Sequence, residues 1–113
     1  MPYLELLIML VGAHFVCDFV LQTDSIATGK NRRLDPAKYG VDWYYWMTAH
    51  AATHGFGVGL ITGNVWLGFL EFCLHWLIDA GKCQKLYGVH TDQILHFACK
   101  LIIVGCVYFF GGF

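Results

Sequence analysis

The chain has 113 residues, which is enough for one domain. Its composition is 58% hydrophobic and only 13% charged, whereas roughly a quarter of the residues in a soluble domain are charged, so we expect an integral membrane protein. The net charge of −1 argues against nucleic acid as a partner. The five cysteines are odd in number and show no C-x-x-C spacing, so neither a disulfide framework nor a thiolate zinc site is expected.

Four apolar stretches follow one another along the chain. At about 1.5 Å per residue, the first is just long enough to cross a hydrocarbon core of about 30 Å. Four consecutive aromatic residues at 43–46 form the kind of belt found at a membrane interface, and they open the second stretch. A tight turn at 62–64 makes the second and third stretches an antiparallel hairpin. We predict an all-α, single-domain integral membrane four-helix bundle, with spans 3–21, 43–61, 65–80 and 93–112.

Two polar connections separate these spans, at 22–42 and 81–92. They contain all but one of the lysines and arginines, namely Lys30, Arg32, Arg33, Lys38, Lys82 and Lys85. In a four-span chain both connections lie on the same side of the membrane, and the positive-inside rule makes that side the cytoplasm. The N and C termini are then expected on the non-cytoplasmic side.

Three glycines of the second span, Gly55, Gly59 and Gly63, recur at four-residue spacing. Small residues at this spacing allow two helices in lipid to approach closely. The same glycines could instead be flexible positions, and the pattern does not distinguish the two interpretations.

Pairs of polar residues four positions apart occur in all four spans. On an α-helix, residues i and i+4 lie one above the other on the same face. With the topology above, all four pairs fall in the cytoplasmic half of the membrane. The pairs are His14 with Asp18, His50 with His54, His75 with Asp79, and Asp92 with His96.

Polar and ionisable groups within a bilayer each cost roughly 2.5–3.5 kcal/mol, so eight of them in one layer should converge in the interior of the bundle. Imidazole and carboxylate are ligands for first-row divalent metals. We therefore expect these eight residues to bind a divalent transition metal, with Zn as the first choice and Mn or Fe as alternatives. Eight groups exceed the four ligands of one tetrahedral zinc, which favours two ions, or one ion with hydrogen-bonding carboxylates around it. A single His–Asp pair would instead be explained as a hydrogen bond between helices.

Four further polar residues extend the same faces. Glu71 and Lys100 lie one helical turn deeper than the pairs, at similar depth, and could form an ion pair. Alternatively they are catalytic, with Glu71 as a ligand or general base and Lys100 binding an anionic substrate oxygen. Gln22 and Gln93 lie beside the pairs and could orient the metal ligands or bind a polar headgroup.

Three sequence blocks carry a family resemblance. They are His14-Phe15-Val16-Cys17-Asp18 continuing to Asp24, His75 to Lys82 with its Asp79-Ala80-Gly81-Lys82 ending, and Asp92-Gln93-x-x-His96. In this order they resemble a family of small polytopic membrane proteins of unknown function found in bacteria and phages. The resemblance implies a bacterial or phage-encoded membrane protein, with no activity to carry over. We expect a multi-pass protein of the bacterial inner membrane. A weaker similarity, limited to the His/Asp patterns, is to inner-membrane metal-dependent hydrolases.

The leading functional hypothesis is a metal-dependent hydrolase that acts on an ester or phosphoester at the membrane surface, with membrane lipid as its partner. A proton or divalent-ion transporter could use the same groups, although the non-cytoplasmic halves of the spans offer few polar residues. Haem ligation by facing histidines is a third alternative, and the aspartates argue against it. The fourth is a non-catalytic accessory protein with a structural metal. Homo-oligomerisation is left open.

Overall fold

The computed structural model describes residues 2–30 and 42–110. This part of the chain is helical and contains no strand, which confirms the all-α prediction. Its elements are α1 (Pro2–Phe15), the π-helical turn η1 (Val16–Val20), α2 (Asp24–Gly29), α4 (Trp43–Thr62), α5 (Val65–Cys83) and α6 (Val89–Phe110). The basic residues Arg32, Arg33 and Lys38 of the first predicted cytoplasmic loop lie outside the described residues.

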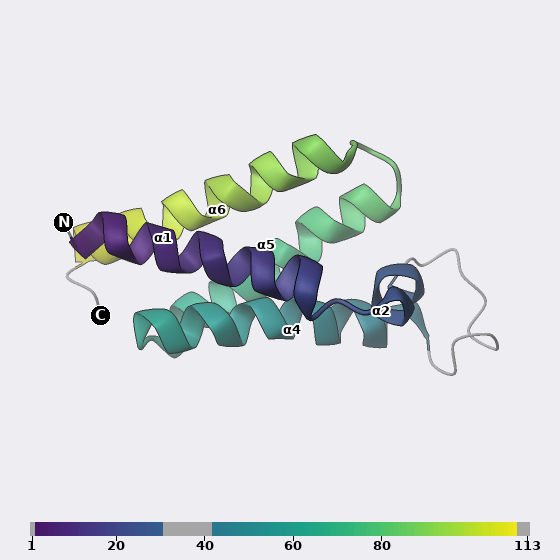
Figure 1. Cartoon of the computed structure of the whole chain (residues 1–113), viewed down its shortest axis with the longest axis horizontal. Helices are drawn as coiled ribbons and strands as arrows, with labels where there is room; N and C mark the ends of the chain where they lie inside the picture. Colours follow the sequence, from purple (N-terminus) through teal and green to yellow (C-terminus); the bar gives the residue numbers. More distant parts are fainter. Residues whose placement is uncertain (1, 31–41, 111–113) are drawn as a thin grey trace.

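The long helices run lengthwise beside one another (Figure 1). α1 packs against α4 and α6, and α5 packs against the same two helices. The start of α1 and the end of α6 lie at one end of the molecule, whereas α2 and the α5–α6 connection lie at the other (Figure 1). This arrangement is compatible with the predicted topology, in which both polar connections share one side.

The two helices of the α4–α5 hairpin pack closely, because glycines at their contact leave no side chain between the backbones. A Cβ atom on Gly68 would lie 2.6 Å from the carbonyl oxygen of Gly55 and 3.1 Å from the Cα of Gly59. Gly63 ends α4 in the left-handed conformation at φ 69°, and the Asn64 side chain accepts hydrogen bonds from the first backbone N–H groups of α5. Gly55 and Gly59 are therefore packing positions, while Gly63 is a turn residue.

The first predicted span is not one continuous α-helix. After Phe15 the chain adopts a π-helical turn, in which the backbone N–H of Leu21 donates to the carbonyl of Val16 at 2.9 Å. A π-turn accommodates one extra residue and often occurs at functional sites. Here it turns both Cys17 and Asp18 into the interior.

The connection between α5 and α6 is shorter than the predicted loop 81–92, because α5 continues to Cys83 and α6 begins at Val89. Tyr87 connects this turn to α5, because its hydroxyl donates a hydrogen bond to the backbone carbonyl of Ile78. Its ring also packs on Gly81, where a Cβ atom would lie only 2.5 Å from the Tyr87 hydroxyl oxygen. Burial raises the pKa of Tyr87, so the phenol stays protonated as the donor.

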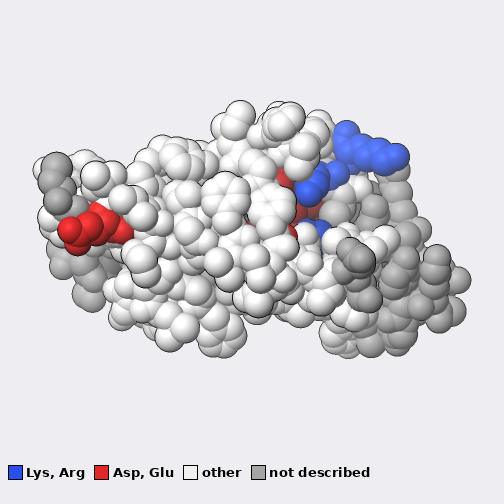
Figure 2. Space-filling model, in the orientation of Figure 1, with Lys and Arg blue, Asp and Glu red and all other residues white. Residues whose placement is uncertain are grey.

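The interior and the exterior of the bundle are inverted relative to a soluble protein. Twelve polar or charged residues are buried among the described residues, against eight hydrophobic ones, while 27 large hydrophobic side chains are exposed. The face drawn in Figure 2 is uncharged except for an acidic group at one end and mixed charges towards the other. Two helical segments, Pro2–Val20 and Val89–Phe110, are long and apolar enough to cross a membrane. α5 carries three charged residues, Glu71, Asp79 and Lys82, and membrane insertion of all four predicted spans stays a prediction.

Candidate metal centre

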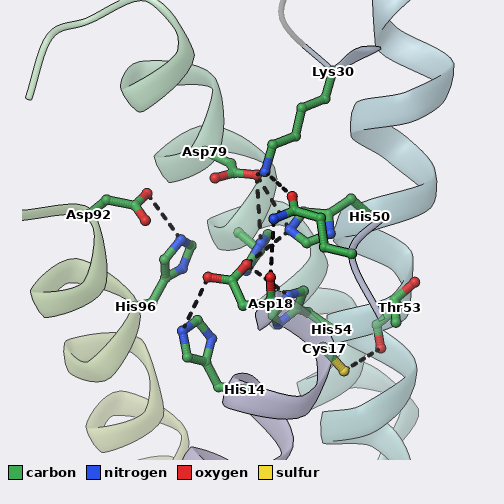
Figure 3. Close-up of polar contacts among 12 residues, drawn as sticks. His14, Cys17, Asp18, Lys30, His50, Thr53, His54, Asp79, Asp92 and His96 are labelled. Atoms are coloured by element: carbon green, nitrogen blue, oxygen red, sulfur yellow. Dashed lines mark hydrogen bonds and ion pairs between the residues drawn. The ribbon is translucent and has the colours of Figure 1, made fainter. Parts of the chain in front are cut away.

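All eight predicted ligands converge between the four long helical segments, at the end nearer α2. Each of these residues is at most 6% exposed. Asp18 lies among three of the histidines, and Lys30 reaches across from α2 to Asp79 (Figure 3). We call these eight residues the polar cluster: His14, Asp18, His50, His54, His75, Asp79, Asp92 and His96.

One part of the polar cluster brings together Asp18, His50, His54 and His75 from three segments of the chain. One ligand atom from each lies within 4.8 Å of the others. Ligands about 2.0–2.1 Å from a tetrahedral ion lie roughly 3.3 Å apart, so small side-chain rotations would close this set around one ion. Both its chemistry and its burial fit a divalent transition metal.

Two further groups continue from the first: one shares His75 with it, and the other shares His96 with that second group. His14, His75 and His96 form one, and Asp79, Asp92 and His96 form the other, each within the same 4.8 Å limit. His75 and His96 are shared between groups, and their ring centroids lie 4.2 Å apart. The three groups therefore form one continuous cluster. The prediction that clustered His and Asp groups could hold a metal is confirmed at the level of geometry.

Several imidazole nitrogens in the polar cluster lack a hydrogen-bond partner among the described residues. They are His14 Nδ1, His54 Nε2, and both ring nitrogens of His75 and of His96. A buried polar atom without a partner typically costs about 1–3 kcal/mol, and such atoms are rare in native proteins. A concentration of them at one place is expected where an ion supplies the missing partner.

Gln93 links three members of the polar cluster. Its side-chain carbonyl accepts from His14 Nε2 at 2.9 Å, and its amide donates to Asp18 Oδ2 at 2.9 Å and to Asp92 Oδ2 at 3.1 Å. In a neutral His14 ring, this bond leaves Nδ1 as the nitrogen with the free lone pair. Gln93 therefore has the position predicted for it, next to the ligands.

Gln22 has hydrogen-bond partners other than the ligand side chains of the polar cluster. Its amide donates to the backbone carbonyl of Asp18 at 3.1 Å, and its side-chain oxygen accepts from Lys30 Nζ at 2.6 Å. Lys30 is 3% exposed and also pairs with Asp79. The sequence predicted that Lys30 lies in a cytoplasmic loop. The structure instead makes it the buried cation of the site, because α2 folds back and packs through Gly29 against the ring of Trp46.

Glu71 and Lys100 form the ion pair that was one of their two predicted roles. Lys100 Nζ donates to Glu71 Oε1 at 2.5 Å, and both side chains are at most 2% exposed. The pair borders the polar cluster, since Glu71 Oε1 lies 3.6 Å from His75 Nδ1. Glu71 Oε2 has no hydrogen-bond partner among the described residues.

A comparison with protein families matches residues 6–111 to a family described as Protein of unknown function (DUF3307). The chain belongs to this family. The match confirms the predicted membership of an uncharacterised family and leaves the membrane, bacterial and phage character as predictions. Neither a search of curated proteins nor a search of solved structures found a match. The weaker similarity to inner-membrane metal-dependent hydrolases therefore gains no support from a relative, and function has to be argued from the site.

Proposed function

We propose that this DUF3307 chain is a membrane-embedded protein that binds divalent metal in the polar cluster. The observation that carries the proposal is the set of fully buried imidazole nitrogens without partners among the described residues. His75 and His96 are both 0% exposed, and neither ring has a hydrogen bond at either nitrogen among those residues. Carboxylates lie beside both rings, with Glu71 Oε1 3.6 Å from His75 Nδ1 and Asp92 Oδ1 3.3 Å from His96 Nε2. An ion bound between the rings and these carboxylates would offset the desolvation penalty that remains.

The donor set supports two ions. Asp18, His50, His54 and His75 suit one of them, while Asp79, Asp92 and His96 suit the other. Imidazole with carboxylate suits Zn best here, with Mn or Fe as the alternatives. The cysteines do not compete for this role, because no group of neighbouring metal ligands in the described chain includes one.

The inverted distribution of side chains supports a membrane location. Large apolar side chains cover much of the outside of the helices, whereas the polar cluster, Lys30, Glu71 and Lys100 are buried. A hydrocarbon phase favours this arrangement, because it leaves the exposed apolar surface at no cost and penalises polar groups on the outside. We place the polar cluster in the cytoplasmic half of a bacterial inner membrane, with membrane lipid as the surrounding partner.

We further propose that the site hydrolyses an ester or phosphoester at the membrane surface. The polar cluster would hold the metal, which would supply a coordinated water of lowered pKa and a Lewis acid for the ester oxygen. Gln93 holds His14 and two carboxylates in orientation, and Glu71 Oε2 is available to accept the proton of the attacking water. The water oxygen then bonds to carbon or phosphorus, the ester C–O or P–O bond breaks, and the alcohol departs with a proton.

A structural metal is the second candidate, favoured by how completely the polar cluster is buried. Transport is less well supported, because Leu10, Val58, Leu67 and Ile103 fill the remaining interior and are at most 4% exposed. A route through the bundle would have to pass these side chains.

Metal analysis of protein purified without chelator tests the proposal. We expect one to two equivalents of a first-row transition metal, which His75→Gln and His96→Gln should each reduce. His90→Gln is the matched control, because His90 is exposed at the start of α6 and outside the polar cluster. Metal-free wild-type protein would refute metal binding. Metal-loaded protein that hydrolyses neither carboxylic nor phosphate ester lipids would support the structural metal instead.

A further inference from the structure

Lys30, at the end of α2, is a buried cation placed directly on one of the proposed metal ligands. The residue is 3% exposed, and its Nζ donates to Asp79 Oδ2 (Figure 3). A second hydrogen bond runs from Nζ to Gln22 Oε1 at 2.6 Å. Lysine is almost never fully buried unless it is paired. The chain itself therefore supplies the positive charge that Asp79 would otherwise take from an ion.

The carboxylate oxygen that Lys30 binds is the one that faces the polar cluster. Asp79 Oδ2 lies 3.5 Å from His50 Nε2 and 3.9 Å from His75 Nε2. A divalent ion bound to either oxygen of Asp79 would bring two positive charges next to the ammonium group, at a buried position where water screens little. An ion and the Lys30 ammonium are therefore competitors for Asp79.

The other two members of this ligand group, Asp92 and His96, are not hydrogen-bonded to an ammonium group among the described residues. Asp92 Oδ1 and His96 Nε2 lie 3.3 Å apart and contact each other. Lys82 Nζ lies 3.9 Å from Asp92 Oδ2, beyond hydrogen-bond distance, and the Lys82 side chain is 34% exposed. Competition with an ion therefore centres on Asp79 and Lys30.

The position of Lys30 depends on the docking of α2 against α4. A Cβ atom on Gly29 would lie 2.7 Å from Cδ1 of the Trp46 ring, so this turn rests directly on the ring. The backbone N–H of Lys30 donates to the carbonyl of Ile26 at 3.1 Å, which makes Lys30 part of the same turn. α2 has six residues and is too short to be stable as an isolated helix. The docking of α2 and the pairing of Lys30 with Asp79 therefore stabilise each other.

We infer that Lys30 is an internal competitor for the second ion, the one proposed to bind Asp79, Asp92 and His96. Without that ion Lys30 neutralises Asp79, and binding of the ion displaces Lys30 and releases α2 from α4. The inference rests on the proposed metal centre and adds how its occupancy is regulated. Coupling between two binding events is reciprocal, so docked α2 weakens ion binding by the same factor by which the ion weakens the docking of α2.

The first measurement is the affinity of the full chain for Zn²⁺ in detergent, by competition with a fluorescent chelator. Lys30→Met removes the competing charge and should raise the affinity for the second ion about tenfold or more, as the loss of a hydrogen bond to a charged group implies. Gly29→Ala keeps every charge but places a methyl group against the Trp46 ring. It should raise the affinity in the same direction by weakening the docking of α2.

Two lysine variants are the controls. Lys82→Met makes the same charge change beside the same ligand group, but Lys82 is partly exposed and not hydrogen-bonded to Asp92, so the gain in affinity should be smaller. Lys85 is exposed in the α5–α6 connection, and Lys85→Met should leave the affinity unchanged. An equal gain in Lys30→Met and Lys82→Met would show a general effect of charge and overturn the inference.

The second measurement is hydrogen exchange over residues 23–30, followed by mass spectrometry. Zn²⁺ should accelerate exchange of this segment in the wild type, because the ion releases α2. In Lys30→Met the segment should exchange faster from the start, and Zn²⁺ should change it little. Exchange in the wild type that Zn²⁺ leaves unchanged would overturn the inference.

Zinc binding across the variants separates this inference from the proposed function. Equal affinity in wild type, Lys30→Met and Gly29→Ala contradicts the inference alone. Absence of zinc binding in all of them contradicts the metal centre and the inference with it. Zinc binding by Lys30→Met but not by the wild type contradicts metal binding by the native chain and supports Lys30 as the competitor.

Discussion

The interior of the bundle has two halves that differ in chemistry although the same helices build both. Towards the chain ends, Leu10, Val58, Leu67 and Ile103 form an apolar core. Towards α2, the polar cluster replaces it. Leu10 lies four residues before His14, and Val58 lies four residues after His54, so each helix presents one continuous inward face that changes from apolar to polar. The apolar half is held by packing, whereas the polar half is held by hydrogen bonds and ion pairs such as Lys30 with Asp79, to which the proposed metal would add bonds of its own.

The largest expected effect comes from removing one partner of a buried ion pair in the polar half. Lys30→Met leaves Asp79 as a buried carboxylate without its cation, which should lower the free energy of unfolding of the metal-free protein by about 3–5 kcal/mol. Added Zn²⁺ should recover most of this loss, because the ion replaces the missing charge. Chemical unfolding in detergent, with and without Zn²⁺, measures both values, and Lys85→Met should change neither. A loss that Zn²⁺ does not restore would argue against Asp79 as a ligand.

A cavity in the apolar half should destabilise the protein independently of metal. Ile103 is fully buried, so Ile103→Ala should cost about 2–5 kcal/mol. Its neighbour Ile102 is 52% exposed, and Ile102→Ala should have a much smaller effect. Unfolding measured with and without Zn²⁺ should give the same difference between the two variants. A strong metal dependence of that difference would mean that the two halves are energetically coupled.

Gln93→Leu tests the hydrogen bonds around the proposed ligands. Removing such an outer partner typically lowers metal affinity about 10–100-fold, here because His14, Asp18 and Asp92 lose their common neighbour. Competition with a fluorescent chelator measures the affinity. Gln22→Leu is the comparison, since the hydrogen bonds of Gln22 within the described chain are to Lys30 and to the backbone carbonyl of Asp18, and its effect should be smaller. An equal effect for both variants would contradict the role assigned to Gln93.

The smallest expected effect lies at the turn of the α4–α5 hairpin. Asn64→Ala removes the acceptor for two backbone N–H groups of α5 and should cost about 1 kcal/mol of stability. Asn64→Asp keeps an oxygen acceptor and should retain most of the wild-type stability. Metal content should stay unchanged in both. A change in metal content would show that the hairpin turn influences the polar cluster from the opposite end.

The apolar stretches predicted the long helices, and the i, i+4 spacing predicted the convergence of the polar cluster, whereas α2, inside the predicted polar connection 22–42, was not predicted as a helix. The i, i+4 spacing of four His/Asp pairs fixes which face each helix turns inward, and a membrane environment requires those faces to meet. The π-turn after Phe15 could not be predicted, because Val16–Val20 has the composition of ordinary apolar helix. Lys30 was assigned to a solvated loop because its partner, Asp79, is 49 residues away, and only the path of α2 brings them together.

X-ray absorption at the edge of the bound metal tests the central claim most directly. For Zn, the polar cluster predicts nitrogen and oxygen ligands at about 2.0–2.2 Å with an imidazole scattering signature, and no sulfur at about 2.3 Å. His75→Gln should reduce the imidazole contribution, while His90→Gln should not. A sulfur shell, or a spectrum that His75→Gln leaves unchanged, would contradict metal binding by the polar cluster.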